Sequence, residues 1–483
     1  MAEIGGDIFF AGIGELNKLL TAKQISAEEL ARAFAARLEQ LGPRYNALAL
    51  PLRQEAIRKA KEADKDIKRG RLRGPLQGIP YAVKDLLSYA GQPTTWGAKP
   101  YAGQVFNYHA AVIERLNDAG AVLTGKLSMV ELAGGGGYRS AAASLFGPGL
   151  NPWDRTRWAG GSSSGSAAAV AAGLAPFAIG SETSGSIVTP ASFCGVTALR
   201  PTYGLVSRYG AMALSWTLDK LGPFARSAED CGLVLAAIAG KDGRDAGSAG
   251  KNFYYTPQYA RPMKELRIGY APADFTDRAE PSARAAFAAA LAVIKDAGVQ
   301  LVEAKLPPFS YGAVLSAILG AEQASIFETL ITSGKVEELQ DPSQIAGLKA
   351  SLDIPARDYL KAMRIRRLMQ AAIQQMWGDV DALLAPGRSG PAPKADQPLG
   401  PLPGASRPLP PPAATPAPPS GLGAIIPAGN LAGLPALVLP CGFAGDLPVA
   451  LQVVGAPWSE NLLLALGKDF QGRTDWHKRR PPV

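Results

Sequence analysis

Serine and glycine are concentrated in two short clusters near the middle of the chain. The first reads GGSSSGS over residues 160–166, and the second reads SGS over residues 184–186. A serine hydroxyl becomes a nucleophile when a neighbouring base removes its proton, and glycine lets the backbone turn sharply and approach a ligand. The two clusters therefore predict a site for nucleophilic catalysis.

The base for such a serine has to be sought outside the usual Ser-His-Asp set. The chain has only 2 histidines, and both His109 and His477 stand in unremarkable contexts. Lysine can serve when burial lowers its pKa enough to make the neutral amine available. Lys84 directly follows an apolar run, Ile79 to Val83, so partial burial is expected. Taken alone, a lysine at a strand end is as a rule a surface charge.

The elements around these residues alternate between helix and strand, which predicts an α/β fold. Ser26 to Glu29 has the spacing of a capping box and precedes a helix with one apolar face. Strands are predicted over residues 79–83, 121–123, 177–180, 196–199, 266–270, 381–385, 436–441 and 449–454. Helices are predicted over residues 54–69, 109–117, 166–172, 186–193, 227–239, 281–297, 311–333, 355–377 and 460–470, with a further helix beginning over residues 128–132.

The predicted strands are spread over the whole length of the chain, although 483 residues would permit two or three domains. We therefore predict a single domain over residues 1–483, in which a central mixed β-sheet is surrounded by helices. Its N-terminal segment, residues 1–70, is predicted to be helical. Residues 386–420 are rich in proline and nearly free of acidic residues, which is typical of a flexible lid or an exposed linker.

Composition excludes several classes of protein. The net charge of +9 is scattered along helices, which indicates solvated helix faces and not a nucleic-acid surface. Three cysteines without paired spacing indicate neither a disulfide framework nor a zinc site, and no metal or other cofactor is expected. No signal peptide and no run of 18 apolar residues is found, so no membrane span is expected and a cytoplasmic location is predicted.

Several motifs in a fixed order resemble those of the amidase signature family. They are the GGSSSGS cluster, the segments GSETSGSIVTPASFCG and LRPTYGLVS, the upstream GIPYAVKDL, and the downstream DKLGPFARSAEDC and GNLAGLPALVLPCGF. The resemblance extends from about Ser26 to Gln471. It implies the family's single α/β domain and its Ser-Ser-Lys triad.

Carried over by position, the resemblance implies a role for each of three residues. Ser186 matches the acylated nucleophile, and Lys84 matches the base. Ser162 matches the serine between them, which the family holds through a cis peptide bond. The implied mechanism is a proton relay in which Lys84 accepts the proton of Ser162 while Ser162 accepts that of Ser186.

Other residues are expected to support this triad. The backbone N–H groups of Thr183, Ser184, Gly185 and Ser186 would hold the oxyanion. Ser163 matches a residue that hydrogen-bonds within the network.

Several neighbouring residues have plainer interpretations. Gly136 and Tyr138 belong to a glycine-rich turn that either lines the substrate pocket or merely permits the turn. Ser164 and Ser166 are expected to cap the alanine-rich helix. Asp85 and Glu182 are expected to support local structure.

Two positions depart from the family pattern. Ser184 stands where the family commonly has glycine, and its side chain is expected to narrow the pocket beside the oxyanion site. Val188 stands where arginine is common. That exchange removes a cation that commonly pairs with an acidic residue, here Glu182.

The predicted function is hydrolysis of a linear C–N bond in a small amide-type substrate through an acyl-enzyme on Ser186. Aryl amides, carbamates and esters are further substrate classes, and the apolar proline-rich loop favours an uncharged or aromatic substrate. The alternative is the A subunit of glutamyl-tRNA(Gln) amidotransferase, which would use glutamine as ammonia donor. That alternative calls for an acidic residue near Gly421 to Pro435, and none occurs between Leu399 and Gly445. A non-catalytic binding protein on the same fold is the second alternative. A monomer or homodimer is expected.

Overall fold

The computed structural model of the chain describes residues 6–256, 258–400 and 421–483. The strands of its main sheet are β1 (Leu48–Pro51), β2 (Pro80–Lys84), β3 (Val122–Leu127), β6 (Phe177–Glu182), β7 (Thr197–Arg200), β8 (Lys220–Ala225), β9 (Arg267–Tyr270), β10 (Gln300–Glu303), β11 (Ala382–Pro386), β12 (Ala436–Ala444) and β13 (Leu447–Gly455). A separate hairpin consists of β4 (Leu150–Asn151) and β5 (Asp154–Trp158).

The sheet runs through the whole described chain in the order β1-β3-β2-β6-β8-β7-β12-β13-β11-β9-β10. Strands β3, β2 and β6 are parallel neighbours, whereas β8, β7, β12 and β13 are joined by antiparallel pairing. The sheet is therefore mixed. A continuous cluster of buried apolar side chains extends from Ile13 to Phe470. The protein is a single large α/β domain with a central mixed sheet flanked by helices, as predicted.

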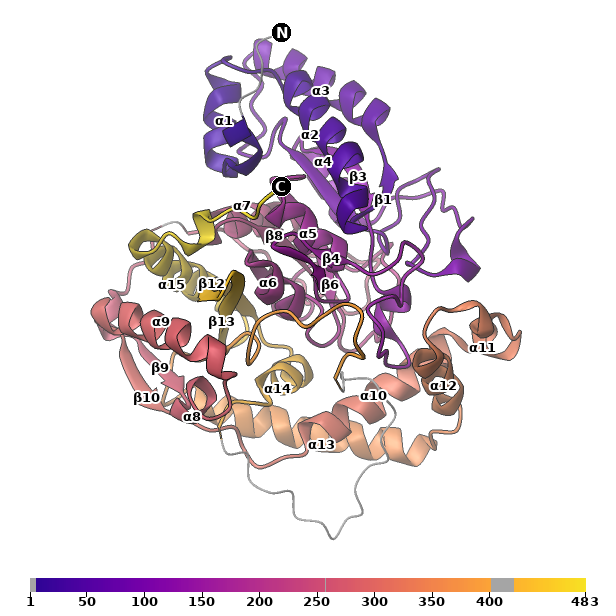
Figure 1. The fold of residues 1–483 in the computed structure, drawn as a ribbon, viewed down its shortest axis with the longest axis vertical. Helices are drawn as coiled ribbons and strands as arrows, with labels where there is room; N and C mark the ends of the chain where they lie inside the picture. Colours follow the sequence, from indigo (N-terminus) through magenta and orange to yellow (C-terminus); the bar gives the residue numbers. More distant parts are fainter. Residues whose placement is uncertain (1–5, 257, 401–420) are drawn as a thin grey trace.

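Helices surround this sheet (Figure 1). They are α1 (Ile13–Thr21), α2 (Ala27–Leu41), α3 (Arg53–Lys68), α4 (Ala111–Asp118), α5 (Ser164–Ala171), α6 (Val188–Cys194), α7 (Ala228–Ile238), α8 (Pro272–Phe275), α9 (Arg284–Asp296), α10 (Tyr311–Ile326), α11 (Glu328–Thr332), α12 (Pro342–Ser351), α13 (Ala356–Met376), α14 (Ile425–Ala432) and α15 (Glu460–Arg473). Figure 1 shows α2, α3 and α4 at one end of the molecule and α10 with α13 at the other.

Local sequence signals explain where several helices begin. The Ser26 hydroxyl accepts from the Glu29 N–H at 3.1 Å, and the Glu29 carboxylate accepts from the Ser26 N–H at 2.9 Å. This is the predicted capping box, and it opens α2. Ser227 caps α7 in the same manner by accepting from the N–H of Asp230. Both caps satisfy backbone donors that the first turn of a helix leaves unpaired.

The small side chains of α5 allow it to lie entirely inside the protein. All residues of α5 are buried, and the helix packs against β6 and α6. A side chain on Gly165 would meet backbone atoms of Ser128 and Ala47 at less than 3 Å, so only glycine fits there. Serine, glycine and alanine therefore bring the residues before and after α5 close to the sheet.

Some predicted elements differ from the structure. No α-helix begins over residues 128–132, because Leu132 and Ala133 have φ of 50° and 54° within a short 3₁₀ turn, outside the range of a right-handed helix. The predicted helix over residues 311–333 is divided into α10 and α11.

No counterpart was predicted for strands β1, β4, β5, β8 and β10 or for helices α8, α12 and α14. The proline-rich stretch lies partly outside the described residues, since only its positions 386–400 are placed. The division of residues 1–483 into an N-terminal helical segment and a loop stays a prediction. Within the described ranges, no helix is both long enough and apolar enough to cross a membrane.

Candidate active site

Lys84 ends strand β2 in the interior of the sheet and is fully buried. Its Nζ atom donates to three hydroxyl oxygens: Ser162 at 2.7 Å, Ser181 at 2.9 Å and Ser163 at 3.1 Å. Parallel pairing of β2 with β6 brings Ser181 alongside, because Val83 lies opposite Ile179. A lysine ammonium has three N–H donors, so the three hydroxyl oxygens accept a hydrogen bond from each of them.

Burial lowers the pKa of Lys84 from 10.5 to about 7, against the opposing effect of Asp219 and Glu182. A buried amine loses its proton readily because the interior disfavours the charged form. The neutral amine has a lone pair, and the Ser162 hydroxyl is the nearest group that can donate to it. At neutral pH, Lys84 can therefore accept a proton from Ser162.

A tight turn presents Ser162 to this amine. Gly160 has φ of 87°, and the peptide bond between Gly161 and Ser162 is cis, as the family resemblance implied. A Cβ atom on Gly161 would lie 2.6 Å from the hydroxyl oxygen of Tyr138, so the turn has no room for a side chain there. Glycine is therefore required at position 161 by the approach of this backbone to the aromatic side chain.

Ser163 links the amine to the end of β6. Its Oγ donates to the carbonyl of Ser181 at 3.1 Å and accepts from the Ser181 N–H at 3.3 Å. Because its proton is already used, Ser163 acts towards Lys84 as an acceptor. The expected capping by the next serines is wrong: Ser164 is already the first residue of α5, which has no side-chain cap, and Ser166 donates to the carbonyl of Ile179.

Ser186 lies on the wall of a small pocket of about 40 Å³. It is 8 % exposed, whereas Ser162 is fully buried. Of these two serines, only Ser186 is accessible to a ligand in the pocket. Among the described residues, no hydrogen bond joins the hydroxyls of Ser162 and Ser186. The two serines are nevertheless adjacent through their backbones, since the N–H of Ser163 donates to the carbonyl of Ser186 at 3.4 Å.

The turn before Ser186 leaves backbone donors available. In the described part of the chain, the N–H groups of Ser184, Gly185 and Ser186 have no backbone acceptor. Thr183, Ser184, Gly185 and Ser186 all line the pocket. Convergent N–H groups of this kind can stabilise a negatively charged oxygen. The four residues predicted for the oxyanion site therefore surround the same space as the Ser186 hydroxyl.

Glu182 fixes the shape of that turn. Its Oε2 accepts from the N–H groups of Ile187 at 2.8 Å and Val188 at 3.0 Å. Its Oε1 accepts from Arg200 at 2.7 Å and from Asn430 at 2.8 Å. Burial raises the pKa of Glu182, but Arg200 and Lys220 outweigh it and hold the pKa at about 2.

Glu182 and Asp85 both have the structural role that the sequence indicated. Glu182 does have a cation, which corrects the expectation drawn from Val188: Arg200 on β7 supplies it. Asp85 forms a buried ion pair with Lys126 at 2.7 Å and accepts from the N–H of Thr95.

The glycine-rich turn divides into two parts. Gly134 and Tyr138 line the pocket of Ser186. Gly136 is not part of this lining; its N–H donates to Gln323 at 2.8 Å, and a Cβ there would meet the carbonyl of Gln344 at 2.4 Å. Tyr138 is therefore placed to contact a ligand, whereas Gly136 serves the packing of the turn.

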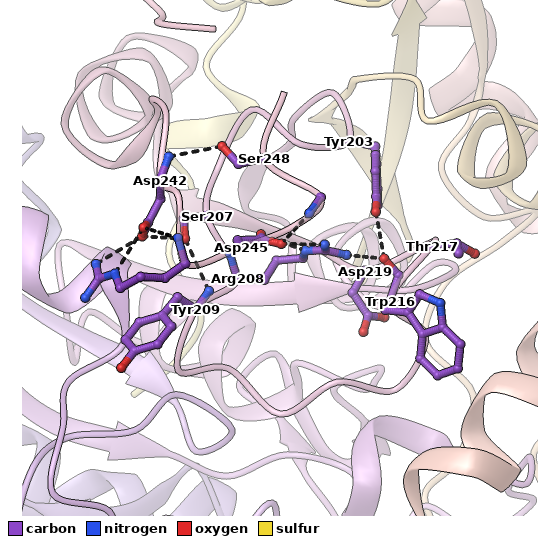
Figure 2. Close-up of polar contacts among 12 residues, drawn as sticks. Tyr203, Ser207, Arg208, Tyr209, Trp216, Thr217, Asp219, Asp242, Asp245 and Ser248 are labelled. Atoms are coloured by element: carbon purple, nitrogen blue, oxygen red, sulfur yellow. Dashed lines mark hydrogen bonds and ion pairs between the residues drawn. The ribbon is translucent and has the colours of Figure 1, made fainter. Parts of the chain in front are cut away.

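A second pocket of about 190 Å³ adjoins the first and shares Ala133, Thr183 and Leu214 with it. Figure 2 shows the polar residues around it, including Asp219 and the ion pair between Arg208 and Asp245, whose atoms are 2.7 Å apart. Asp219 accepts from the hydroxyl of Thr183 at 2.5 Å and from the N–H of Leu214 at 2.8 Å. Asp219 therefore connects Thr183, at the start of the turn before Ser186, to the loop that contains Leu214.

Comparison with known proteins agrees with this arrangement. A family model described as Amidase matches residues 29–464. The chain belongs to the amidase signature family. The match spans nearly the whole described domain, including both serine clusters and the strand that ends at Lys84.

Curated relatives of this amidase-family chain carry the name of an amidotransferase subunit. It is 35% identical to the A subunit of the glutamyl-tRNA(Gln) amidotransferase from Carboxydothermus hydrogenoformans, over 99% of this chain and 100% of that one. Identity to the protein of the same name from Synechococcus sp. strain JA-3-3Ab is 37%, over 98% and 94%.

Among solved structures, native peptide amidase from Stenotrophomonas maltophilia superimposes with a TM-score of 0.80 at 30% identity, covering 98% of each chain. A structure described as a vestigial protein complex that reveals the origins of an s-triazine catabolic enzyme gives a TM-score of 0.84 at 30% identity, covering 96% of this chain and 98% of that one.

Sequence reasoning about this amidase missed four residues around the site: Ser181, Arg200, Asp219 and Arg388. Ser181 lies one residue beyond the predicted strand end, in a segment that the family motif already included. Arg388 lies in the proline-rich stretch that follows the predicted strand 381–385, and it lines the pocket of Ser186. The sequence around each residue was visible, but it did not indicate which distant residues or pocket each side chain would contact.

Proposed function

We propose that the protein hydrolyses the C–N bond of a linear amide through an acyl-enzyme on Ser186. The observation that carries this proposal is the buried Lys84 amine, whose pKa lies near 7 and whose Nζ is 2.7 Å from Ser162. A buried lysine without an ion-pair partner among the described residues is costly for the fold, which is expected where a perturbed pKa serves chemistry.

The proton relay begins with neutral Lys84. Lys84 accepts the proton of Ser162 while Ser162 accepts the proton of Ser186, and the Ser186 oxygen attacks the amide carbonyl. This step requires the Ser186 hydroxyl to rotate into hydrogen-bonding distance of Ser162 when substrate binds, since such contacts commonly tighten only in the complex. The N–H groups of residues 183–186 receive the negative charge on the carbonyl oxygen.

Collapse of the tetrahedral intermediate breaks the C–N bond. Ser162 gives its proton to the departing amine and recovers one from protonated Lys84. Water then attacks the ester on Ser186, with the same relay removing its proton, and the carboxylic acid leaves. Esters, aryl amides and carbamates offer the same carbonyl to Ser186, so the relay itself does not select among them.

Labelling with a fluorophosphonate probe tests this proposal. Wild-type protein should become covalently labelled on Ser186, and Ser186→Ala should not. Ser192→Ala is a matched control, because Ser192 lies on α6, the helix that follows Ser186, and donates to the carbonyl of Val188 outside the pocket lining. A folded wild-type protein that stays unlabelled across a range of pH would contradict the proposal and favour a binding protein on this fold.

The second candidate is the A subunit of a glutamyl-tRNA(Gln) amidotransferase, which the names of the relatives favour. In that role the same Ser186 chemistry would act on glutamine and hand on ammonia. Against it stands the lining of the Ser186 pocket itself, which includes no acidic residue among those described that could bind the ammonium group of glutamine. The acidic residues of the adjoining pocket, Asp219 and Asp245, already interact with Thr183 and Arg208. Co-purification with partner subunits, together with glutaminase activity, would support the amidotransferase. Hydrolysis of simple amides without partners and without activity on glutamine would support the hydrolase.

A further inference from the structure

Arg388 occupies a distinctive place beside Ser186. It lies on the segment directly after β11, and its side chain lines both the pocket of Ser186 and an adjoining pocket of about 230 Å³. Among the described residues that line the pocket of Ser186, Arg388 is the only one that carries a charge. The electrostatic character of this pocket is therefore set by a single guanidinium group.

The charge of Arg388 is not compensated within the described protein. Its guanidinium forms no ion pair with any described carboxylate, and its Cζ lies over the ring of Phe193, 6.0 Å from the ring centroid. Burial lowers the pKa of Arg388, but a guanidinium keeps its proton in proteins. The pocket thus holds a mostly buried positive charge, and such a charge is unfavourable until an anion joins it.

Two other buried arginines in the described protein have ion-pair or hydrogen-bond partners. Arg200 forms an ion pair with Glu182 and also donates to the carbonyl of Leu434. Arg366 donates to the carbonyls of Leu431 and Thr217. Arg388 differs from both because its donors face a pocket, so a structural role does not account for it.

Two further polar groups line the same pocket. The hydroxyl of Ser184 is buried and has no hydrogen-bond partner in the described protein. Tyr138 also lines the pocket and interacts electrostatically with Arg388. A guanidinium and hydroxyl donors without an accompanying acid suit a ligand rich in acceptor oxygens.

We propose that Arg388 determines specificity by binding a carboxylate on the substrate, so that the preferred substrate is a short amide that carries a carboxylate. This inference rests on the proposed hydrolysis at Ser186 and names its substrate class. It replaces the uncharged or aromatic substrate that the apolar loop suggested. The arginine fork binds a carboxylate through two parallel hydrogen bonds, which would also orient the amide carbonyl toward Ser186.

The test compares each monoamide of a short dicarboxylic acid with its neutral diamide. The two members of a pair have nearly the same shape and the same scissile bond, but only the monoamide carries a carboxylate. We expect wild-type kcat/KM to favour the monoamide by about 10-fold or more, the size of effect that a charge-assisted hydrogen bond produces. Arg388→Met should lose this preference, and Arg388→Lys should recover part of it.

Arg367→Met is the matched control, since Arg367 is an exposed arginine of α13 outside the pocket. This variant should prefer the monoamide to the same degree as the wild-type enzyme. A wild-type enzyme that hydrolyses both amides equally, or an Arg388→Met variant that keeps the preference, would overturn the proposal. Failure of the hydrolase proposal itself is distinguished by the absence of fluorophosphonate labelling on Ser186 in wild type.

Discussion

The Nζ atom of Lys84 lies 2.7 Å from the Oγ atom of Ser162, although 78 residues separate them in the chain. Strand β2 brings the lysine into the interior, and the turn before α5 brings the serine to it. Both residues are fully buried. The contact is therefore shielded from water, which lowers the pKa of the amine and leaves Ser186 as the exposed end of the relay.

The first prediction concerns pH. Because the neutral form of Lys84 accepts the proton, activity should be lost as the pH falls and Lys84 becomes protonated. The pKa of Lys84 near 7 places the midpoint of kcat/KM close to pH 7, with full activity about one unit above it. The measurement is kcat/KM from pH 5 to 9 on an uncharged amide. A profile that is flat through the acid range would exclude lysine as the base.

The second prediction separates two buried lysines. Lys84→Met should reduce kcat by about 10²–10⁴-fold, the usual contribution of a general base, with little loss of stability because Lys84 has no carboxylate contact among the described residues. Lys126→Met should instead lower the free energy of unfolding by about 3–5 kcal/mol, since it leaves the buried carboxylate of Asp85 unpaired.

Urea denaturation of the two lysine variants and of wild type provides this comparison. Equal destabilisation by the two substitutions would show that Lys84 is a structural residue. Loss of activity in Lys84→Met with an unchanged unfolding midpoint is the expected result.

The sequence determines more of the fold than of the site. Periodicity and capping signals predict α2, β2, α7 and β13 because these elements depend on neighbouring residues. Strand β8 escaped prediction, since Gly222 and Pro223 in its centre are typical of loops. It forms because β6 and β7 flank it on both sides, which is a long-range effect.

The same difference between local sequence signals and long-range contacts applies to the site residues. The positions of Lys84, Ser162 and Ser186 were available from motifs. The ion pair between Glu182 and Arg200 could not be predicted from motifs. The family commonly has an arginine at the position of Val188, and here Arg200 on β7 supplies the cation instead. Arg388 could not be identified from a motif either, because its proposed role depends on its place in the pocket and on the absence of an ion pair with a described carboxylate.

A third prediction concerns Glu182. Arg200→Met leaves its carboxylate buried without a cation in contact, and we expect a loss of about 3–5 kcal/mol in the free energy of unfolding. Activity should fall as well, because Glu182 holds the N–H groups of Ile187 and Val188 that shape the turn. Arg473→Met is the control: it breaks a partly exposed ion pair with Asp469, and such pairs contribute about 0–1 kcal/mol. If both variants lost the same small amount, the turn would not depend on Arg200.

A fourth prediction ranks the serines that contact Lys84. Ser162→Ala removes the hydroxyl that passes the proton and should nearly abolish turnover. Ser163→Ala removes only an acceptor for Lys84 and a link to Ser181, so the loss in kcat should be smaller and the pH midpoint should shift. Parallel pH profiles of the two variants check this order. A larger loss in Ser163→Ala than in Ser162→Ala would reverse the assigned roles.

The most direct measurement of the central claim is the mass of the protein during turnover. Acid quenching of the reaction with a slowly hydrolysed ester or aryl amide, followed by peptide mass spectrometry, should locate the acyl group on Ser186. Ser186→Ala should show neither adduct nor turnover. Turnover that persists in Ser186→Ala, or an acyl group found on another residue, would contradict the account.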